Sequence, residues 1–320
     1  MAPRREIVTV YAAGLVQGIG LVTFPAASAV FTNPHQYGLS STAYGGMFVP
    51  QAVMAIAASW LGAGWRSHLG TKRIYLLGLF ANLLAMTLLV ASWFVMRERS
   101  WAYGILLVAT ACMGIGFGFT VPALNTLAAA FFPKKIDDAV LALNALLGLG
   151  TALAPVFIAL FVGFGIWWGL PVLVGGLLVG LLLVSASQAL RVGESTHSGT
   201  AKKGRTKLPA RFWIFASFVL LYGVCETMNG NWASLYLTKH FGASVATASI
   251  ALALFWGMVT VGRVLFAVLA EWFPARLVSR VLPFVVMSAL LAGAWAPATK
   301  PTPGPLPIPP AAPRWTIRAG

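Results

Sequence analysis

Long apolar segments without charge constrain this chain more than any other feature of its sequence. The stretch from Ile105 to Val121 contains no charged residue, and about 20 apolar residues in a row are enough for a helix to cross a bilayer. In hydrocarbon the backbone must satisfy its own hydrogen bonds, in helices or in a closed barrel. A barrel would show short alternating segments instead. With 59% hydrophobic and 9% charged residues, the sequence excludes an ordinary soluble protein and predicts an all-α, polytopic transmembrane helix bundle.

The apolar segments divide the chain into predicted domains. About nine are long enough to span a membrane, at residues 7–31, 43–63, 74–96, 101–131, 139–164, 167–189, 212–237, 244–268 and 277–296. A polar, basic stretch at residues 191–211 separates the first six from the last three and is typical of a flexible cytoplasmic linker. We therefore predict a six-helix N-terminal half (1–190), this linker, a partial C-terminal half of three helices (212–296) and a tail (297–320).

The tail at residues 297–320 is rich in proline. Proline removes a backbone donor and clashes with the preceding helical turn, so this stretch is predicted to be extended and disordered. One explanation is a natural extracellular tail. The other, which we favour, is an abnormal end within the ninth helix that leaves three helices absent. That explanation predicts a chain that does not transport as written, because alternating access needs two complete halves.

The basic residues set the predicted orientation. With the N-terminus cytoplasmic, sixteen fall on the inside and only three, Arg97, Arg99 and Lys239, on the outside. The inside set is Arg4, Arg5, Arg66, Lys72, Arg73, Lys134, Lys135, Arg191, Lys202, Lys203, Arg205, Lys207, Arg211, Arg263, Arg276 and Arg280. Membrane proteins keep Lys and Arg on the cytoplasmic side, which accounts for the net charge of +15. We therefore predict a protein of the inner membrane, in contact with lipid. The sequence has no basic stripe interleaved with aromatic residues outside the apolar segments, so we do not expect nucleic acid as a partner.

Sequence motifs for catalysis and metal binding are missing from the chain. The four histidines lie in loops or at span ends, and Cys112 and Cys225 lie in apolar segments outside any CxxC pair. HExxH, GxSxG and Gly-Lys-Ser/Thr motifs are all absent from the sequence. We therefore expect no enzymatic activity, no metal and no cofactor, and we do not expect an ATP-driven pump.

Three segments carry a resemblance to a known family. They are the fourth span with Gly114, Gly116, Gly118, Pro122 and Asn125, the fifth with Asn144, Gly148, Gly150 and Pro155, and the seventh with Tyr222, Glu226, Asn229, Asn231 and Trp232. Together they resemble the major facilitator superfamily, over about residues 7–295 and not in the tail. The seventh span is similar to that of the fucose-permease-like branch. The resemblance implies two six-helix halves that rock around a central solute site.

The segment from Gly62 to Arg73 stands where the superfamily has its signature between the second and third helices. Gly70, Lys72 and Arg73 match that signature, whereas Ser67 replaces its acid and His68 its arginine. Losing the acid removes the charge contact that the resemblance implies for the inward gate. An ordinary basic cytoplasmic loop is the alternative interpretation.

Glu226 is the strongest candidate for a functional side chain. It is the only acidic residue well inside a predicted span, and a carboxylate there is costly unless it faces a cavity. A desolvated carboxyl can exchange a proton near neutral pH, so we predict that Glu226 couples transport to protons. Tyr222 and Asn229, at i−4 and i+3, share its helix face and are predicted to bind solute. A structural hydrogen bond to a neighbouring helix is the alternative for Glu226.

Other polar residues at mid-span are further candidates for binding solute. Trp232 is either a ring that stacks on a sugar or an interfacial anchor, and we expect Asn231 to serve packing. Asn144, Asn125 and Gln17 each place an amide near the middle of a span, where hydrogen bonds between helices are the alternative role.

These residues predict a secondary transporter that binds a small solute at the midplane. We expect proton-linked symport of a sugar or similar polar molecule, with Glu226 as the coupling group. The alternatives are an efflux carrier of the same fold for an amphipathic compound and a membrane protein that transports nothing. The sequence leaves the oligomeric state open.

Overall fold

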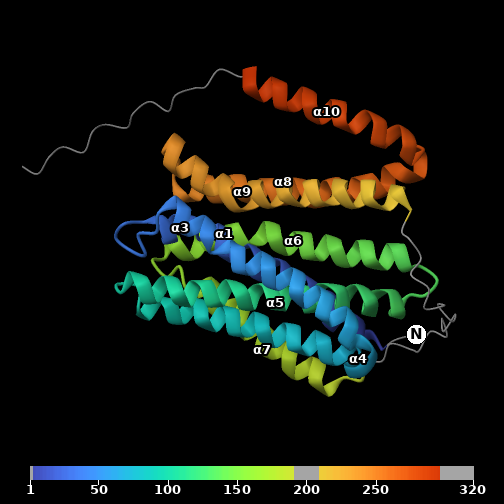
Figure 1. Ribbon diagram of the computed structural model, residues 1–320, viewed down its shortest axis with the longest axis horizontal. Coiled ribbons are helices and arrows are strands. Elements are labelled where there is room, and N and C mark those ends of the chain that lie inside the picture. Colours follow the sequence, from blue (N-terminus) through green and yellow to red (C-terminus); the bar gives the residue numbers. More distant parts are fainter. Residues whose placement is uncertain (1–2, 191–208, 296–320) are drawn as a thin grey trace, which may run out of the picture.

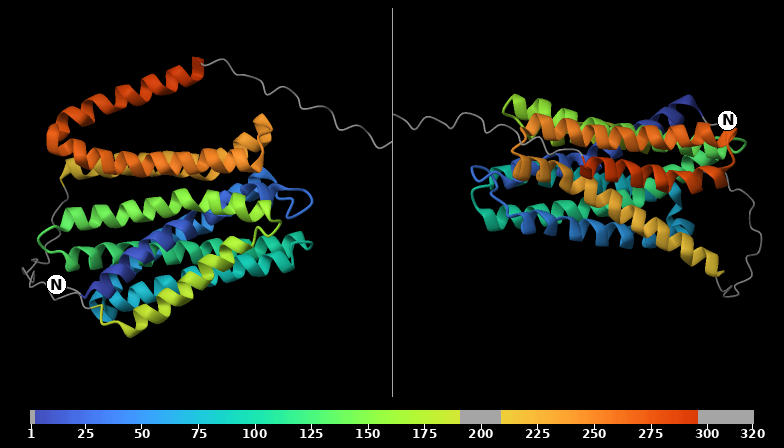
Figure 2. Two further views of the ribbon diagram at one scale, coloured as in Figure 1. Left: turned by 180° about the vertical axis from the view of Figure 1, so that it is seen from behind. Right: turned by 90° about the horizontal axis from the view of Figure 1, so that it is seen from above.

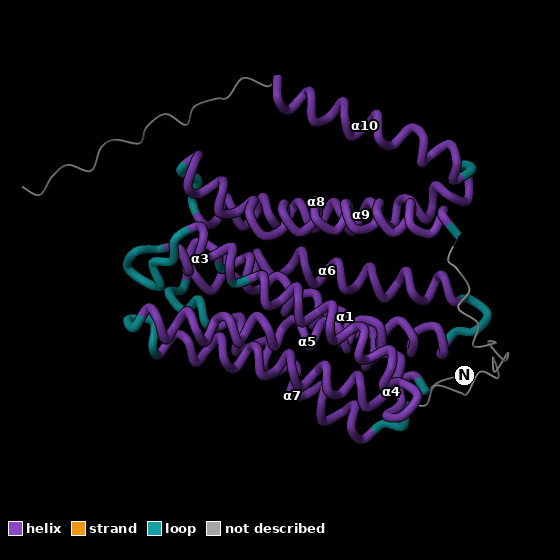
Figure 3. Tube along the Cα trace, viewed as in Figure 1, coloured by secondary structure: helices purple, strands orange, loops and turns teal. Residues whose placement is uncertain are grey.

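Every element that the computed structural model describes is an α-helix, as Figure 1 and Figure 3 show. The structure describes residues 3–190 and 209–295; the predicted Pro-rich tail and most of the predicted linker lie outside these residues. The helices are α1 (Arg4–Ala26), α2 (Ser28–Thr32), α3 (Ser41–Gly46), α4 (Phe48–Phe94), α5 (Arg99–Phe131), α6 (Ile136–Gly163), α7 (Gly169–Ser187), α8 (Ala210–Phe241), α9 (Val245–Trp272) and α10 (Ala275–Trp295). The predicted all-α bundle is confirmed.

The predicted spans correspond to these helices with one correction. Among the described residues, seven helical stretches are long and apolar enough to cross a membrane, and one of them, Ser41–Phe94, is 54 residues long and holds the second and third predicted spans. Two helices meet there at Gly70, whose φ of 76° and ψ of 157° are not helical. The prediction of a loop at residues 62–73 is therefore wrong. The chain is helical on both sides of Gly70, and the break is confined to this residue because glycine, without a Cβ, adopts the non-helical conformation without a clash. The ninth predicted span is α10, of which Arg280–Ala289 forms a shorter apolar stretch.

The residues of the 62–73 signature hold helix ends together. The Lys72 ammonium donates to the carbonyl oxygens of Ala186, at 2.9 Å, and Gln188, which belong to the C-terminal end of α7. A cation at this position satisfies carbonyls that have no partner within the helix and complements the negative end of the helix dipole. The Arg66 guanidinium donates to Thr126 of α5 at 3.2 Å. These contacts join helices without the missing acid.

Glycines bring the backbones of α1 and α6 into contact. A Cβ atom on Gly18 would lie 1.9 Å from the carbonyl oxygen of Leu147, and one on Gly150 would lie 2.1 Å from that of Leu15. Only glycine allows so close an approach, which is a common way for transmembrane helices to associate.

A small amide cluster lies inside the packed helices. The Asn82 amide donates to Gln17 Oε1 at 2.6 Å and to the hydroxyl of Thr120 at 3.4 Å, and so joins α1, α4 and α5. Asn82 fits because Gly116 has no side chain, since a Cβ there would lie 2.0 Å from Asn82 Oδ1. Gln17 and Asn82 are almost fully buried.

Many polar side chains in the spans donate a hydrogen bond within their own helix. Each of these hydroxyls donates to the carbonyl oxygen four residues earlier, at 2.8–2.9 Å, in Thr23, Thr87, Thr126, Ser217, Thr260 and Ser288. Hydroxyls that bond back in this way leave no unpaired donor in hydrocarbon.

Helices α8 and α9 pack together at one side of the bundle, and α10 stands apart from them. Figure 1 and Figure 2 show α8 and α9 beside α6 and α1, with α10 at the periphery. Side chains of α8 such as Phe215 and Leu220 are about 70% exposed, which lipid tolerates because its chains are as apolar as leucine. The cavity described next lies where α8 and α9 meet the other helices.

Candidate functional site

A cavity of about 470 Å³ lies between the two groups of helices. Helices α1, α4, α5 and α6 form one wall, and α8 and α9 form the other. Much of the surface is apolar, with Leu21, Phe48 and Phe117 among the lining residues. The polar lining residues are Gln51, Asn144, Thr151, Glu226, Thr227, Asn231, Thr260 and Arg263. The cavity is large enough for a small solute and is apolar apart from a few polar groups, as ligand sites usually are.

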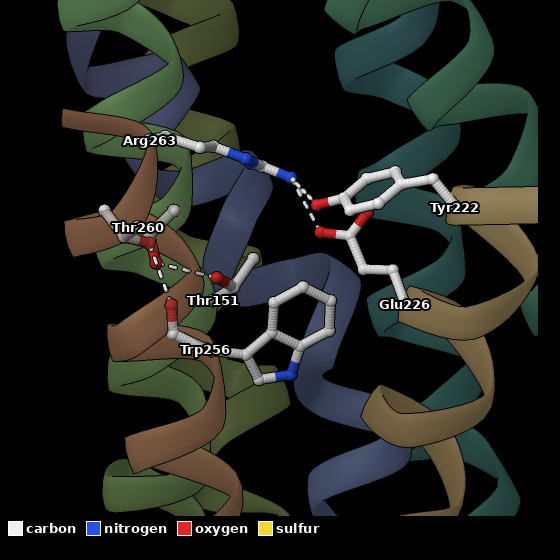
Figure 4. Close-up of polar contacts among 7 residues, drawn as sticks. Thr151, Tyr222, Glu226, Trp256, Thr260 and Arg263 are labelled. Atoms are coloured by element: carbon white, nitrogen blue, oxygen red, sulfur yellow. Dashed lines mark hydrogen bonds and ion pairs between the residues drawn. The ribbon is translucent and has the colours of Figure 1, made fainter. Parts of the chain in front are cut away.

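An ion pair dominates the wall formed by α8 and α9. Figure 4 shows Arg263 of α9 reaching Glu226 of α8, with Nη2 2.7 Å from Oε1. The same nitrogen lies 3.4 Å from the Tyr222 hydroxyl. The Glu226 side chain is 19% exposed and that of Arg263 is 38% exposed. A charge inside a span normally needs such a partner, so Glu226 and Arg263 explain each other's position.

The place of Arg263 corrects the sequence analysis. We counted Arg263 among the inside basic residues, but it lies within α9, nine residues before the end of that helix at Trp272. It is a wall residue of the cavity, so fifteen basic residues remain in the predicted inside set. The sequence held a clue, because Arg263 falls within the predicted span at residues 244–268 and needed a carboxylate partner there.

A second hollow, of about 740 Å³, adjoins this ion pair. Asp137, Asn144, Tyr222 and Arg263 are among its lining residues. Arg263 and Asn144 thus border both spaces, whereas Glu226 borders the first and Tyr222 the second. Tyr222 therefore lies beside the ion pair, outside the lining of the first cavity.

Two asparagines predicted from separate spans lie together. The Asn144 amide donates to Asn125 Oδ1 at 3.2 Å and to the carbonyl oxygen of Val140 at 2.8 Å. Asn144 lines the cavity, and Asn125 supports it from α5. The sequence left two roles open for these asparagines, solute contact and hydrogen bonding between helices. Asn144 lies where it can contact a solute, and its hydrogen bond to Asn125 joins α6 to α5.

Two buried polar atoms at the cavity have no hydrogen-bond partner within the described part of the chain. They are the side-chain oxygen Oε1 of Gln51 and the indole nitrogen Nε1 of Trp256, and both residues line the cavity. A buried polar group without a partner is costly, so these atoms suit a ligand or water. Figure 4 shows Trp256 on α9 below the ion pair, and Thr260 pointing toward Thr151 of α6. The sequence analysis missed Gln51, Trp256 and Thr260.

The remaining predicted residues lie away from the cavity. Gln17 belongs to the buried amide cluster with Asn82. The Asn229 amide donates to the carbonyl oxygen of Cys225 at 2.9 Å, and Asn229 and Trp232 line a separate surface hollow. Asn231, which we expected to serve packing, lines the cavity instead. The reason is geometric, because Asn231 follows Thr227 by four residues and shares its face, whereas Asn229 lies on the other side of Glu226.

Trp232 closes one end of the contact between the two groups of helices. Its ring packs edge-on against Tyr44, with ring centroids 5.7 Å apart, and the Tyr44 hydroxyl donates to the carbonyl oxygen of Asn231 at 2.7 Å. A Cβ on Gly45 would lie 2.6 Å from the Trp232 ring. Lys239 donates to the Ser41 hydroxyl at 3.0 Å nearby. Trp232 of α8 therefore packs against α3.

A cavity between two groups of membrane-length helices is the arrangement that a solute carrier requires. The family model of the Major Facilitator Superfamily matches residues 7–308. The chain belongs to the Major Facilitator Superfamily. The match continues past residue 295, where we expected the resemblance to end, so the superfamily is confirmed and that boundary is corrected. No curated protein matches the chain.

Membership of the Major Facilitator Superfamily defines the coarse function. Proteins of this superfamily are secondary transporters that carry small-molecule solutes across membranes, and they are not enzymes. The chain is therefore an integral membrane protein with the fold of a secondary transporter. Among the described residues, no group of three His, Cys, Asp or Glu side chains is placed to hold a metal ion.

Proposed function

We propose that this protein is a proton-coupled symporter of a small polar solute, and that Glu226 is its coupling carboxyl group. The observation that carries the proposal is the Glu226–Arg263 pair in the wall of the cavity, at 2.7 Å. Within the part of the chain that the structure describes, Glu226 is the only acidic residue that lines this cavity. If the Glu226 carboxyl gives up its contact with Arg263 when it takes up a proton beside the solute, binding of the proton and binding of the solute are linked.

The solute that we propose is a hydroxylated molecule of about the size of a sugar. The similarity of the seventh span to the fucose-permease-like branch supports this class. Asn144, Thr151, Thr260 and Asn231 offer polar groups around the cavity, and Trp256 offers an aromatic face on which a sugar ring can stack. Trp256 takes the role that the sequence analysis gave as one option for Trp232.

We also propose that the helices rock as two units around the cavity. The N-terminal half of residues 1–190 and the helices of residues 212–296 would be the moving parts, joined by the linker of residues 191–211. The contact of Tyr44 and Gly45 with α8 supports a closed gate on the side that the basic residues predict to be outside. Alternating access then follows from opening this contact.

The direct test of coupling replaces Glu226 with an isostere that does not titrate. Glu226→Gln keeps a hydrogen-bond acceptor for Arg263 but binds no proton. In proteoliposomes with an imposed pH gradient, we expect accumulation of labelled fucose, glucose or glucuronate to be lost in this variant. Exchange of the same solute across the membrane without a gradient should continue.

A matched control for this test is Glu98→Gln, which alters an exposed acid just before α5. It should leave both accumulation and exchange unchanged. Accumulation that keeps its pH dependence in Glu226→Gln would contradict the coupling role. Uptake of none of the three solutes by the unaltered chain would contradict the proposed symport and agree with the chain that does not transport, which the sequence analysis predicted.

The efflux alternative rests on the apolar part of the cavity wall, where Leu21, Phe48 and Phe117 suit an amphipathic compound. The same proteoliposomes separate the two functions. Competition by amphipathic cations, without accumulation of polar solutes, would favour efflux.

The proposed orientation is tested by cysteine labelling at the two ends of α5. Lys134 is predicted to lie inside and Glu98 outside, and both are exposed. An impermeant thiol reagent should label Glu98→Cys in intact cells and Lys134→Cys only after permeabilisation. The opposite pattern would reverse the orientation.

A further inference from the structure

We propose that the transported solute carries a carboxylate, and that Arg263 binds this group when Glu226 is protonated. The inference rests on the proposed function, and it narrows the solute to an organic anion such as a sugar acid. Its basis is the position of a single guanidinium in the cavity wall, paired with a group that a proton can neutralise.

Arg263 is suited to bind an anion because of its chemistry and its place. Among the described residues that line the cavity, it is the only cationic one. A guanidinium presents a planar fork of donors that matches a carboxylate and holds it through two hydrogen bonds. Its side chain is 38% exposed, so part of it is open to a molecule in the cavity or in the adjoining hollow.

Charge balance explains why the solute should be an anion. In the structure, Glu226 Oε1 balances Arg263 at 2.7 Å. Protonation of Glu226 removes that negative charge and leaves the guanidinium without compensation in a largely apolar wall, which is costly. An uncharged sugar does not restore the balance, whereas a carboxylate does. Proton and anion therefore favour each other's binding, which is the thermodynamic requirement for coupling.

The other groups around the pair do not replace Glu226 in this exchange. Tyr222 on α8 contributes a hydroxyl 3.4 Å from Arg263. Asp137 at the start of α6 lines the adjoining hollow together with Arg263, and no contact between the two is seen in the described residues. From α1, α4, α5 and α6, no ionisable side chain is among those that line the first cavity.

The unpaired polar atoms indicate what the rest of the solute carries. Gln51 Oε1 accepts hydrogen bonds and Trp256 Nε1 donates one, and both atoms are buried without a partner in the described structure. Hydroxyl groups satisfy both, because a hydroxyl is donor and acceptor at once. A hydroxylated carboxylate therefore matches the cation and both atoms, and a sugar acid fits within about 470 Å³.

Binding of matched pairs to the purified full-length chain tests the inference. The probes are glucuronate against glucuronamide, and lactate against lactamide, which differ in charge and hardly in size. Thermal stability in detergent reports binding, measured at about pH 5.5 and about pH 7.5. We expect each carboxylate to stabilise the protein and its amide not to, with a larger thermal shift by the carboxylate at the lower pH.

Three variants assign the effect to the pair. Arg263→Gln should lose stabilisation by the carboxylates at both pH values, and Arg263→Lys should keep part of it because the charge remains. Glu226→Gln, which resembles the protonated state, should bind the carboxylates as tightly at the higher pH as at the lower. Arg66→Gln removes a guanidinium that contacts Thr126 outside the cavity, and the carboxylates should stabilise this variant by as much as they stabilise the unaltered chain.

The outcomes separate this inference from the proposed function. Equal stabilisation by an acid and its amide, no stabilisation by either acid, or carboxylate binding that persists in Arg263→Gln would overturn it. If glucose is accumulated with protons but glucuronate is not, the proposed function stands and the carboxylate inference is wrong. If the carboxylates bind through Arg263 without proton-driven accumulation, the inference stands and the symport is wrong.

Discussion

The first five transmembrane stretches and the last two differ in burial. In an apolar 18-residue window of Arg4–Thr32, 67% of residues are buried, against 17% in that of Val245–Phe266. The two windows have the same mean hydropathy, so composition does not account for the difference. In a bilayer an apolar side chain can contact either lipid or protein without a hydrophobic penalty. Contact with protein is favoured only where the helices pack closely.

The consequence is that the two regions depend on different interactions. Helices α1 to α7 are held by close backbone contacts and a buried amide cluster. Helices α8 and α9 face the other helices across the cavity. They contact them through the Tyr44–Trp232 pair and through the packing of α9 on α6. Substitutions of equal size should therefore have unequal effects in the two regions.

The largest difference is expected from removing one leucine side chain in each region. Leu106 in α5 is fully buried, whereas Leu220 in α8 is 68% exposed. Leu106→Ala leaves a cavity and should lower the free energy of unfolding by about 3 kcal/mol. Leu220→Ala leaves no cavity and should change it by less than about 0.5 kcal/mol. Reversible unfolding in mixed detergent micelles measures both, and equal losses would refute the comparison.

A glycine pair should change stability in opposite directions. Gly18→Ala places a methyl group against the Leu147 backbone, which has no side-chain freedom to move away, and should cost about 2 kcal/mol. Gly223 in α8 has nothing within 4 Å of an added Cβ, so Gly223→Ala should stabilise its helix by up to about 1 kcal/mol. The same unfolding assay reports both signs. Destabilisation by both variants would mean that α8 packs more tightly than its exposure indicates.

The smallest effect is expected at the junction of the two regions. Tyr44→Phe removes the hydrogen bond to the Asn231 carbonyl at 2.7 Å and should weaken the junction by about 0.6 kcal/mol. Cross-linking between cysteines placed at Ser41 and Lys239 should then slow by up to about threefold, because the closed junction is less populated.

Tyr11→Phe is the matched control for the junction. Its hydroxyl donates to the Ala139 carbonyl at 3.0 Å between α1 and α6, inside the first region. Its loss should leave the cross-linking rate unchanged. An equal slowing in both variants would show that the two regions move as one.

The sequence predicted the fold well because membrane insertion depends on local properties. Length and apolar composition identify a span without knowledge of its neighbours, and a lone acid such as Glu226 is conspicuous among apolar residues. The exact turn between the second and third spans was missed, because one residue, Gly70, is enough to make it.

The lining of the site was harder to predict because it depends on how helices rotate against one another. Helical periodicity gives the angle between Asn229 and Asn231 but not which of them faces a cavity. Gln51 and Thr260 carry no sequence pattern that separates them from packing residues. Arg263 was counted with the basic residues of the inside set, although its partner Glu226 had already been identified.

The hydroxyls of Thr23 in α1 and Thr126 in α5 bond within their own helices, and this has a consequence for biosynthesis. A helix of this kind can leave the translocation machinery and enter the bilayer without waiting for a partner. The Glu226–Arg263 pair is different, because each charge is compensated only when the other is present. We therefore expect α8 to remain in contact with water or the insertion machinery until α9 emerges, and the two helices to partition into the membrane together as a hairpin.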